Sequence, residues 1–178
     1  MAQQESNISE YVEQLANRET LLAAWAELQK AGDAALPEVR AGLSHPEWRV
    51  RQWCAMFLDH HWDVESLRRL VLTLHDPKLK VRKAAVHSLG CDRCKGGENP
   101  IDAVPLLAER LREDKSIKVR RTAALTLAIQ KPERRIARIF GTILRDETDP
   151  KLRTWAEWGL KRYQDSQQSA PQDAKQAD

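Results

Sequence analysis

Apolar residues along most of the chain recur at intervals of three and four positions, the spacing that places them on one face of a helix. Four segments show this pattern most clearly, because they superpose without gaps. They are VRQWCAMFL (50–58), VRKAAVHSL (81–89), VRRTAALTL (119–127) and LRTWAEWGL (152–160). Self-similarity at this spacing indicates an array in which one supersecondary unit is repeated about four times.

A second apolar pattern at helical spacing precedes each of these segments. Its members are Leu36, Val39 and Leu43; Leu67, Leu70, Val71 and Leu74; Val104, Leu107 and Leu111; and Ile136, Ile139, Phe140 and Ile143. The two patterns are joined by the turns SHPEW, HDPKL, EDKSI and DETDP, in which Pro or Asp ends one helix and begins the next. No segment alternates over enough residues to indicate a strand. The chain therefore predicts an all-α fold of about four stacked helix pairs.

The repeats, in residues 33–163, are flanked by two segments of different character. Residues 1–32 hold two amphipathic patterns that break near Asn17, and we expect them to form an N-terminal helical cap. Residues 164–178, QDSQQSAPQDAKQAD, contain almost no large apolar side chain and are predicted to be a disordered tail. The cap residues expected to face the first repeat are Tyr11, Leu15, Leu22, Trp25 and Leu28.

The turns carry a further regularity, an acidic residue six positions before an Arg that follows Val or Leu. The pairs are Asp76 and Arg82, Asp114 and Arg120, and, with substitutions, Glu147 and Arg153. The first copy departs from this pattern, with His45 opposite Arg51. In these residues the chain resembles the HEAT-repeat family over about residues 33–163, and more closely its bacterial HEAT-like branch named after phycobilisome lyases.

The resemblance implies an α-solenoid, an armadillo-like α–α superhelix in which each helix pair buries its apolar face on its neighbours. It also implies that each repeated Arg pairs with the turn acid of its own or of the neighbouring repeat, forming a structural ladder. Members of the family are mostly scaffolds for protein–protein interaction. We therefore expect a non-enzymatic binding scaffold.

The charge of the chain is unevenly distributed. Its net charge is +3, but Lys and Arg are concentrated in residues 48–163, whereas residues 1–47 and 164–178 are acidic. Basic residues recur in the first turn of the second helices, where the helix dipole also favours anions. They predict a basic ridge that binds an acidic protein segment or a nucleic acid. The simpler interpretation is a cationic face that only contacts solvent. The candidate partner-binding residues are Arg49, Lys80, Lys83, Lys118, Arg121 and Lys151.

The stretch HSLGCDRCKGG, residues 87–97, lies in the longest interval between copies of the repeat and contains two of the three cysteines. It can be a widened loop, a redox pair or part of a zinc site. In the stacked register Cys91 corresponds to His60 one repeat earlier, so the zinc hypothesis places Cys91 and Cys94 beside His60 or His61, with His87 as a further candidate. Apart from this zinc ion, no cofactor is expected.

Tryptophan and arginine gather with aspartate in WRVRQWCAMFLDHHWD, residues 48–63. In composition this segment resembles the HEAT-like alkylpurine DNA glycosylases, which implies DNA binding and alkyl-base repair near Trp48 and Trp62 as an alternative function. Trp53 shares a helical face with Val50 and Phe57 and is interpreted as core. The sequence has no Gly-rich phosphate loop, HExxH or GxSxG motif, and an enzyme is therefore the minority hypothesis.

The cysteine content and the hydropathy of the chain indicate its cellular compartment. Three cysteines are too few, and odd in number, for a secreted disulfide framework. The start, MAQQESNISE, lacks the basic and apolar regions of a signal peptide, and no run of apolar residues is long enough for a membrane span. We therefore expect a cytoplasmic protein without a membrane partner.

Overall fold

The computed structural model describes residues 2–96 and 99–169, which form ten α-helices, two short 3-10 helices and no strand. This confirms the predicted all-α solenoid. The helices of the cap are α1 (Ala2–Gln14) and α2 (Leu21–Ala31). The repeats are α3 (Leu36–Gly42) with α4 (Trp48–Phe57), α5 (Val64–Leu72) with α6 (Leu79–Gly90), α7 (Ala103–Glu113) with α8 (Ile117–Ile129), and α9 (Arg134–Asp146) with α10 (Pro150–Gln168). The 3-10 helices are η1 (Gly32–Ala35) and η2 (Thr73–His75).

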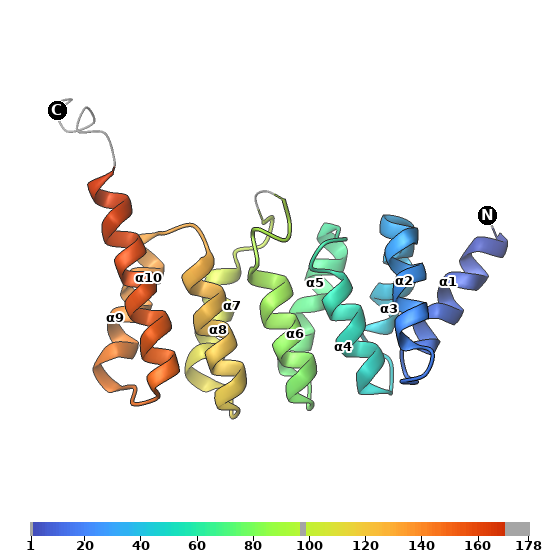
Figure 1. Ribbon diagram of the computed structural model, residues 1–178, viewed down its shortest axis with the longest axis horizontal. Coiled ribbons are helices and arrows are strands. Elements are labelled where there is room, and N and C mark those ends of the chain that lie inside the picture. The colour runs from blue at the N-terminus through green and yellow to red at the C-terminus, as the bar shows by residue number, and fades with distance from the viewer. Residues whose placement is uncertain (1, 97–98, 170–178) are drawn as a thin grey trace.

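The helix pairs stand side by side in a row, with the two ends of the chain at opposite ends of the row (Figure 1). The second helices of the repeats, α4, α6, α8 and α10, pack against one another in sequence and form one layer. The first helices, α3, α5, α7 and α9, lie behind them in the view of Figure 1. Because this layer repeats along the row, residues at equivalent positions of the second helices form columns on its surface.

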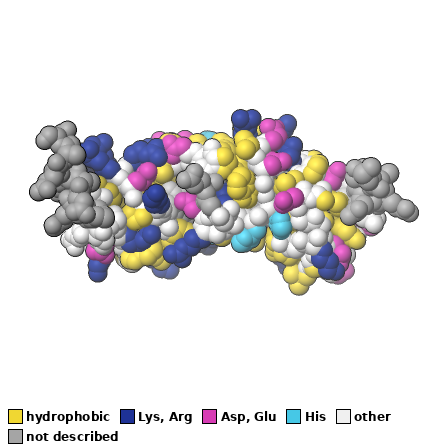
Figure 2. Space-filling model, turned by 90° about the horizontal axis from the view of Figure 1, so that it is seen from above, with side chains coloured by type: hydrophobic (Ala, Val, Ile, Leu, Met, Phe, Trp, Pro, Cys, Tyr) yellow, Lys and Arg dark blue, Asp and Glu magenta, His cyan; other side chains and the backbone are white. Residues whose placement is uncertain are grey.

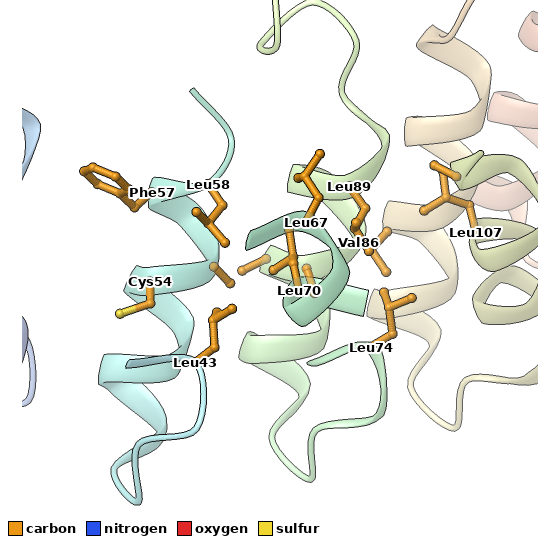
Figure 3. Packing of buried hydrophobic residues seen from close by; sticks show 14 of the residues in the cluster. Leu43, Cys54, Phe57, Leu58, Leu67, Leu70, Leu74, Val86, Leu89 and Leu107 are labelled. Carbon is orange, nitrogen blue, oxygen red and sulfur yellow. The ribbon is translucent and has the colours of Figure 1, made fainter. Parts of the chain in front are cut away.

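The core is continuous along the row, because each helix pair buries its apolar side chains against the next. Leu67 and Leu70 of α5 are completely buried, and they lie between the side chains of α4 and those of α6 (Figure 3). Full burial of one such leucine contributes about 1.5–3 kcal/mol relative to leaving it exposed. Trp53 packs against this core, 4.9 Å from Trp25 of the cap between ring centroids.

Acidic N-caps fix where several helices begin. The carboxylate of Asp63 accepts a hydrogen bond from the backbone N of Ser66 at 2.6 Å, and that of Asp149 accepts one from Leu152 at 3.0 Å. Such a cap contributes about 0.5–2 kcal/mol relative to Ala. In the second and third repeats, the turn residues Asp76 and Asp114 instead accept hydrogen bonds from the backbone N of Lys78 and Ser116, just before the second helices begin.

Two predictions for the ends of the chain need correction. Leu22 was expected to face the first repeat, but its side chain is 73% exposed because it lies on the outer face of α2. Helix α10 continues to Gln168, so the first residues of the predicted tail are helical, and residues 170–178 of that tail lie outside the described residues. Within residues 2–96 and 99–169, no helix has both the length and the apolar character needed to cross a membrane.

Candidate functional site

Each repeated arginine is anchored to the backbone of its own turn. Arg82 Nη1 donates to the carbonyl oxygen of Asp76 at 2.8 Å, and Arg120 Nη1 donates to that of Asp114 at 3.2 Å. Arg153 Nη1 likewise donates to the carbonyl oxygen of Glu147 at 3.0 Å. The spacing of six residues therefore reflects a contact between a side chain and the backbone within one repeat.

The carboxylates of the turns pair with the preceding repeat instead. Arg82 donates through Nε and Nη2 to Asp114 at 2.7 and 2.9 Å, and both side chains are almost completely buried. Arg51 binds Asp76 in the same bidentate manner at 2.6 and 3.1 Å. Burial would raise the pKa of Asp114, but its hydrogen bonds from Arg82 and from the backbone N of Ser116 hold that pKa below its ordinary value.

The third pair does not use the residues of the sequence pattern. Its arginine is one position later in α8, and its carboxylate is two positions later in the turn. Arg121, rather than Arg120, donates to Asp149 at 3.0 and 2.5 Å, while Glu147 accepts from the backbone of its own turn. The arginine ladder therefore consists of the pairs Arg51–Asp76, Arg82–Asp114 and Arg121–Asp149. Because Arg121 is already occupied by an ion pair within the chain, we remove it from the candidate partner-binding residues.

The departure at His45 has a structural reason. A turn carboxylate receives the arginine of the preceding repeat, and the unit before the first repeat is the cap, which supplies no such arginine in the described residues. His45 Nε2 instead lies 3.1 Å from a carboxylate oxygen of Glu13 in α1. Arg51 needs only the carbonyl oxygen of residue 45, to which it donates at 2.7 Å.

The remaining cations of the predicted ridge lie on the second-helix layer. Lys80, Lys83, Lys118 and Lys151 are exposed, and no carboxylate of the described residues is within 4.0 Å of their amino groups. Arg49 is half-buried and paired with Glu47 at 3.3 Å. Lysine therefore supplies most of the charge that this surface can offer to a partner.

A groove of about 660 Å³ crosses this surface from the cap to α8. Lys80 and Lys83 of α6 line it together with polar side chains of α4 and α8. Its apolar wall comes from Trp25 of the cap, Met56 of α4 and Leu125 of α8. Figure 2, which looks down on the ends of the helices, shows Lys and Arg side chains interspersed with acidic and hydrophobic ones. The groove thus offers cationic and apolar contacts within one concave surface.

Trp48 and Trp62, near which the alternative DNA-binding function was placed, have different surroundings. The Trp48 ring is covered by cations, with the guanidinium of Arg49 and the amino group of Lys80 each 4.9 Å from its centroid. Trp62 packs against the hydrophobic core at the start of α5. Each ring therefore already has partners within the chain, and cation–π contact holds Lys80 at the edge of the groove.

A cluster of four potential metal ligands lies at the other end of the second helices, beside the loop that projects between α6 and α7 (Figure 1). We call Asp59, His87, Cys91 and Cys94 the four-ligand cluster, because one ligand atom from each lies within 4.8 Å of all the others. The sulfur atoms of the two cysteines are 2.8 Å apart. His87 Nε2 is 3.9 Å from the sulfur of Cys94 and 3.2 Å from Asp59 Oδ2.

Local structure explains how these side chains meet. Asp59 lies in the turn after α4, and His87 in the last turn of α6. Helix α6 ends at Gly90, where the backbone N of Cys91 makes the last helical hydrogen bond, to the carbonyl oxygen of His87 at 2.9 Å. The backbone of Cys91 itself is extended, so the chain leaves the helix at this residue. Because α4 and α6 are adjacent in the layer, their ends and this loop converge.

Burial and charge perturb several groups of this cluster. Burial raises the pKa of the Cys94 thiol, and its contacts with Cys91 and Asp59 raise it further. Burial would also raise the pKa of Asp59, but hydrogen bonds from His87 and Cys94 hold it below its ordinary value. Lys95 is 7% exposed and donates to the carbonyl oxygen of Ser88, and burial lowers its pKa. The cluster thus combines two thiols, an imidazole and a carboxylate with a buried ammonium group close by.

Sequence reasoning placed only some of these residues. The structure brings Cys91 and Cys94 together, with His87 beside them, but His60 and His61 do not join the four-ligand cluster. The His60 side chain is 63% exposed, and His61 stacks on Phe57 with its Nδ1 3.2 Å from Asp33. The superposition of the repeats pairs Cys91 with His60. The side chain that points toward α6 is that of Asp59, one residue earlier, and it was therefore missed.

The comparison with protein families agrees with this architecture. Residues 67–161, more than half of the chain, match the family model described as HEAT repeats. The chain belongs to the HEAT-repeat family. The match begins in α5, so it spans the second to fourth HEAT repeats, which carry the acidic turn residues, and omits the first, with its His45. A search of curated proteins found no match. A HEAT-repeat chain of this kind is a helical repeat scaffold.

Proposed function

We propose that this HEAT-repeat scaffold binds an acidic protein segment in the groove of its second-helix layer. The observation that carries the proposal is the combination of Lys80 and Lys83 with the apolar side chains of Trp25, Met56 and Leu125 around one concave surface. Lys118 continues the cationic surface one helix further along the row. An acidic segment with interspersed apolar residues complements both features.

The exposure of these side chains determines how much each kind of contact contributes to the binding affinity. Exposed lysines contribute about 0.2–1 kcal/mol each to an ion pair, and they mainly steer and orient a charged partner. Burial of apolar side chains supplies most of the affinity of a protein interface, for which tryptophan and methionine are favoured residues. We therefore expect the partner to combine carboxylates with at least one large apolar side chain that enters the groove between Met56 and Leu125.

The charge pattern supports a protein segment over a nucleic acid. A phosphate backbone is recognised by a run of cations, each of which adds salt-dependent affinity. Here Arg51, Arg82 and Arg121 are occupied by the arginine ladder. Asp59 also places a carboxylate at one end of the groove. The uninterrupted part of the cationic surface is therefore short, and the apolar wall has no counterpart in a phosphate backbone.

Fluorescence anisotropy with defined probes tests the proposal. The probes are a labelled peptide of alternating glutamate and leucine, the same peptide with glutamine in place of glutamate, and labelled duplex DNA, each measured at two salt concentrations. We expect the acidic peptide to bind, and the charge reversals Lys80→Glu, Lys83→Glu and Lys118→Glu together to weaken it about tenfold or more. The glutamine peptide is expected to bind more weakly than the acidic one.

A matched control reverses the same number of charges on the first helices. Arg68, Arg112 and Arg134 are exposed on α5, α7 and α9, and their replacement by Glu changes the net charge by the same amount. This control variant is expected to bind the acidic peptide like the parent. Equal weakening in both variants would show that net charge alone causes binding. Salt-sensitive binding of DNA with no binding of the acidic peptide would replace the proposal by the nucleic-acid alternative.

A further inference from the structure

The four-ligand cluster is the one place in the described residues where His, Cys and acidic side chains converge closely enough to hold a metal ion. Its sulfur atoms are 2.8 Å apart, farther than the roughly 2.05 Å of a disulfide bond, and both cysteines are free thiols. We propose that Asp59, His87, Cys91 and Cys94 bind one zinc ion. This inference does not rest on the proposed binding function, although Asp59 and His87 also line one end of the groove.

The geometry is close to that of a tetrahedral zinc site. With Zn–S bonds of about 2.3 Å and Zn–N and Zn–O bonds of about 2.0–2.2 Å, neighbouring ligand atoms lie about 3.3–3.8 Å apart. The distances from His87 Nε2 to Asp59 Oδ2 and to the sulfur of Cys94, 3.2 and 3.9 Å, bracket that range. An increase of about 1 Å in the distance between the two sulfur atoms would complete the tetrahedron. All four ligand atoms already lie within 4.8 Å of one another.

An independent observation points to a missing ligand at Asp59. The residue is only 8% exposed, and its Oδ1 is buried without a hydrogen-bond partner in the described residues. Leaving a buried acceptor unsatisfied costs about 1–3 kcal/mol, and more for a charged group. A metal ion bound by this carboxylate would remove that cost.

The donor set selects the class of metal. Two thiolates and an imidazole favour zinc and disfavour calcium or magnesium, which prefer shells of oxygen ligands. A zinc ion with two thiolates, one carboxylate and a neutral imidazole carries a net charge of −1. The buried ammonium group of Lys95, which interacts electrostatically with Asp59 and both cysteines, would neutralise it. The site would thus be electrically balanced despite its burial.

Four protein ligands leave no open position for a substrate, so this is a structural site. Asp59 follows α4, His87 lies in the last turn of α6, and both cysteines belong to the loop that leads to α7. Zinc would therefore tie the first repeat to the second and fix the start of the loop that widens the interval between the second and third repeats. A closed site of this kind stabilises the folded chain, because the unfolded chain binds the ion more weakly.

Zinc titration of the full chain, reduced and freed of metal, tests this assignment. We expect one equivalent to bind, and the cobalt-substituted protein to show the intense visible and near-ultraviolet absorption of tetrahedral thiolate coordination. His87→Gln and Asp59→Asn each remove one ligand with little change of shape, and they are expected to weaken zinc binding about hundredfold or more. Zinc should raise the thermal midpoint of the parent and not that of His87→Gln.

His60→Gln is the matched control, because His60 lies outside the cluster even though its Nε2 is 3.8 Å from Asp59 Oδ2 and its side chain is mostly exposed. This variant is expected to bind zinc like the parent. Circular dichroism of each metal-free variant separates loss of a ligand from loss of the fold. Binding by the reduced parent well below one equivalent would overturn the assignment, as would loss of binding in His60→Gln with full binding in His87→Gln.

Discussion

The second helices differ in chemistry between their two ends. At their N-terminal ends, the arginine ladder joins each repeat to the next through pairs such as Arg82–Asp114, whose side chains are 4% and 1% exposed. The four-ligand cluster lies at the C-terminal ends of α4 and α6; it is the single cluster of this kind in residues 2–96 and 99–169, and it leaves Asp59 Oδ1 without a partner there. The contacts at the N-terminal ends thus recur from repeat to repeat and are satisfied by the chain, whereas this cluster lacks a partner for one of its oxygens.

This difference separates structural residues from candidate functional ones. A contact that recurs in successive repeats stabilises the stacking common to every copy. A cluster found at one junction has no role in every copy, and its unsatisfied acceptor supports the proposed metal ion. The groove combines both kinds of residue, since Met56 and Leu125 occupy the same position of the repeat, whereas Trp25 comes from the cap.

The largest expected effect comes from breaking the buried pair of the ladder. Arg82→Ala leaves the carboxylate of Asp114 buried without its partner, and we expect a loss of about 3–5 kcal/mol in the free energy of unfolding. Chemical denaturation followed by circular dichroism measures this loss. Arg69→Ala is the control, because its ion pair with Glu65 is exposed on α5 and contributes about 0–1 kcal/mol.

A second variant distinguishes loss of the pair from loss of packing. When Arg82→Met is combined with Asp114→Asn, no uncompensated charge is buried, and the cap to the backbone N of Ser116 remains available. We expect this double variant to be more stable than Arg82→Ala. A loss in Arg82→Ala no greater than that in Arg69→Ala would mean that the ladder does not hold the repeats together.

A smaller effect is expected from Gly90, at the cluster end of α6. A Cβ atom added there would lie 2.6 Å from Leu107 Cδ1 and would also collide with Thr126 Cγ2. Gly90→Ala is therefore expected to destabilise the fold by about 1–3 kcal/mol. Gly141→Ala in α9 meets no atom within 4 Å and should stabilise the fold by up to about 1 kcal/mol. Equal stability of the two variants in urea would show that the cluster end of α6 is loosely packed.

Periodicity was enough to predict the fold, but only part of the site. The repeated Asp and Arg positions indicated a ladder, yet the choice between Asp149 and Glu147 depends on which carboxylate reaches the preceding helix in three dimensions. His60 and Asp59 are neighbours in the sequence, and a shift of one residue at the end of a helix decides which one faces α6. Trp25 joins the groove from the cap, which shares no repeat pattern with α4.

The smallest expected effect lies at the displaced pair of the ladder and appears as a pH dependence. Hydrogen bonds from Arg121 lower the pKa of Asp149 from 3.8 to about 2. A carboxyl whose pKa is lower in the folded than in the unfolded chain contributes stability above the unfolded pKa and loses it as the pH falls toward the folded pKa. The stability that this pair contributes should therefore disappear between about pH 4 and pH 2.

Asp149→Asn keeps an acceptor for the backbone N of Leu152 but removes the charge, so its stability should fall less steeply than that of the parent across this window. Arg121→Gln should flatten the profile less than Asp149→Asn does, because the backbone N groups of Leu152 and Lys151 still lower the pKa of Asp149. The double variant should match Asp149→Asn. The residual acid sensitivity would then come from pairs such as Arg82–Asp114, whose carboxyl pKa is also lowered. Parallel profiles for Asp149→Asn and the parent would show that the displaced pair contributes nothing to the stacking of α8 on α10.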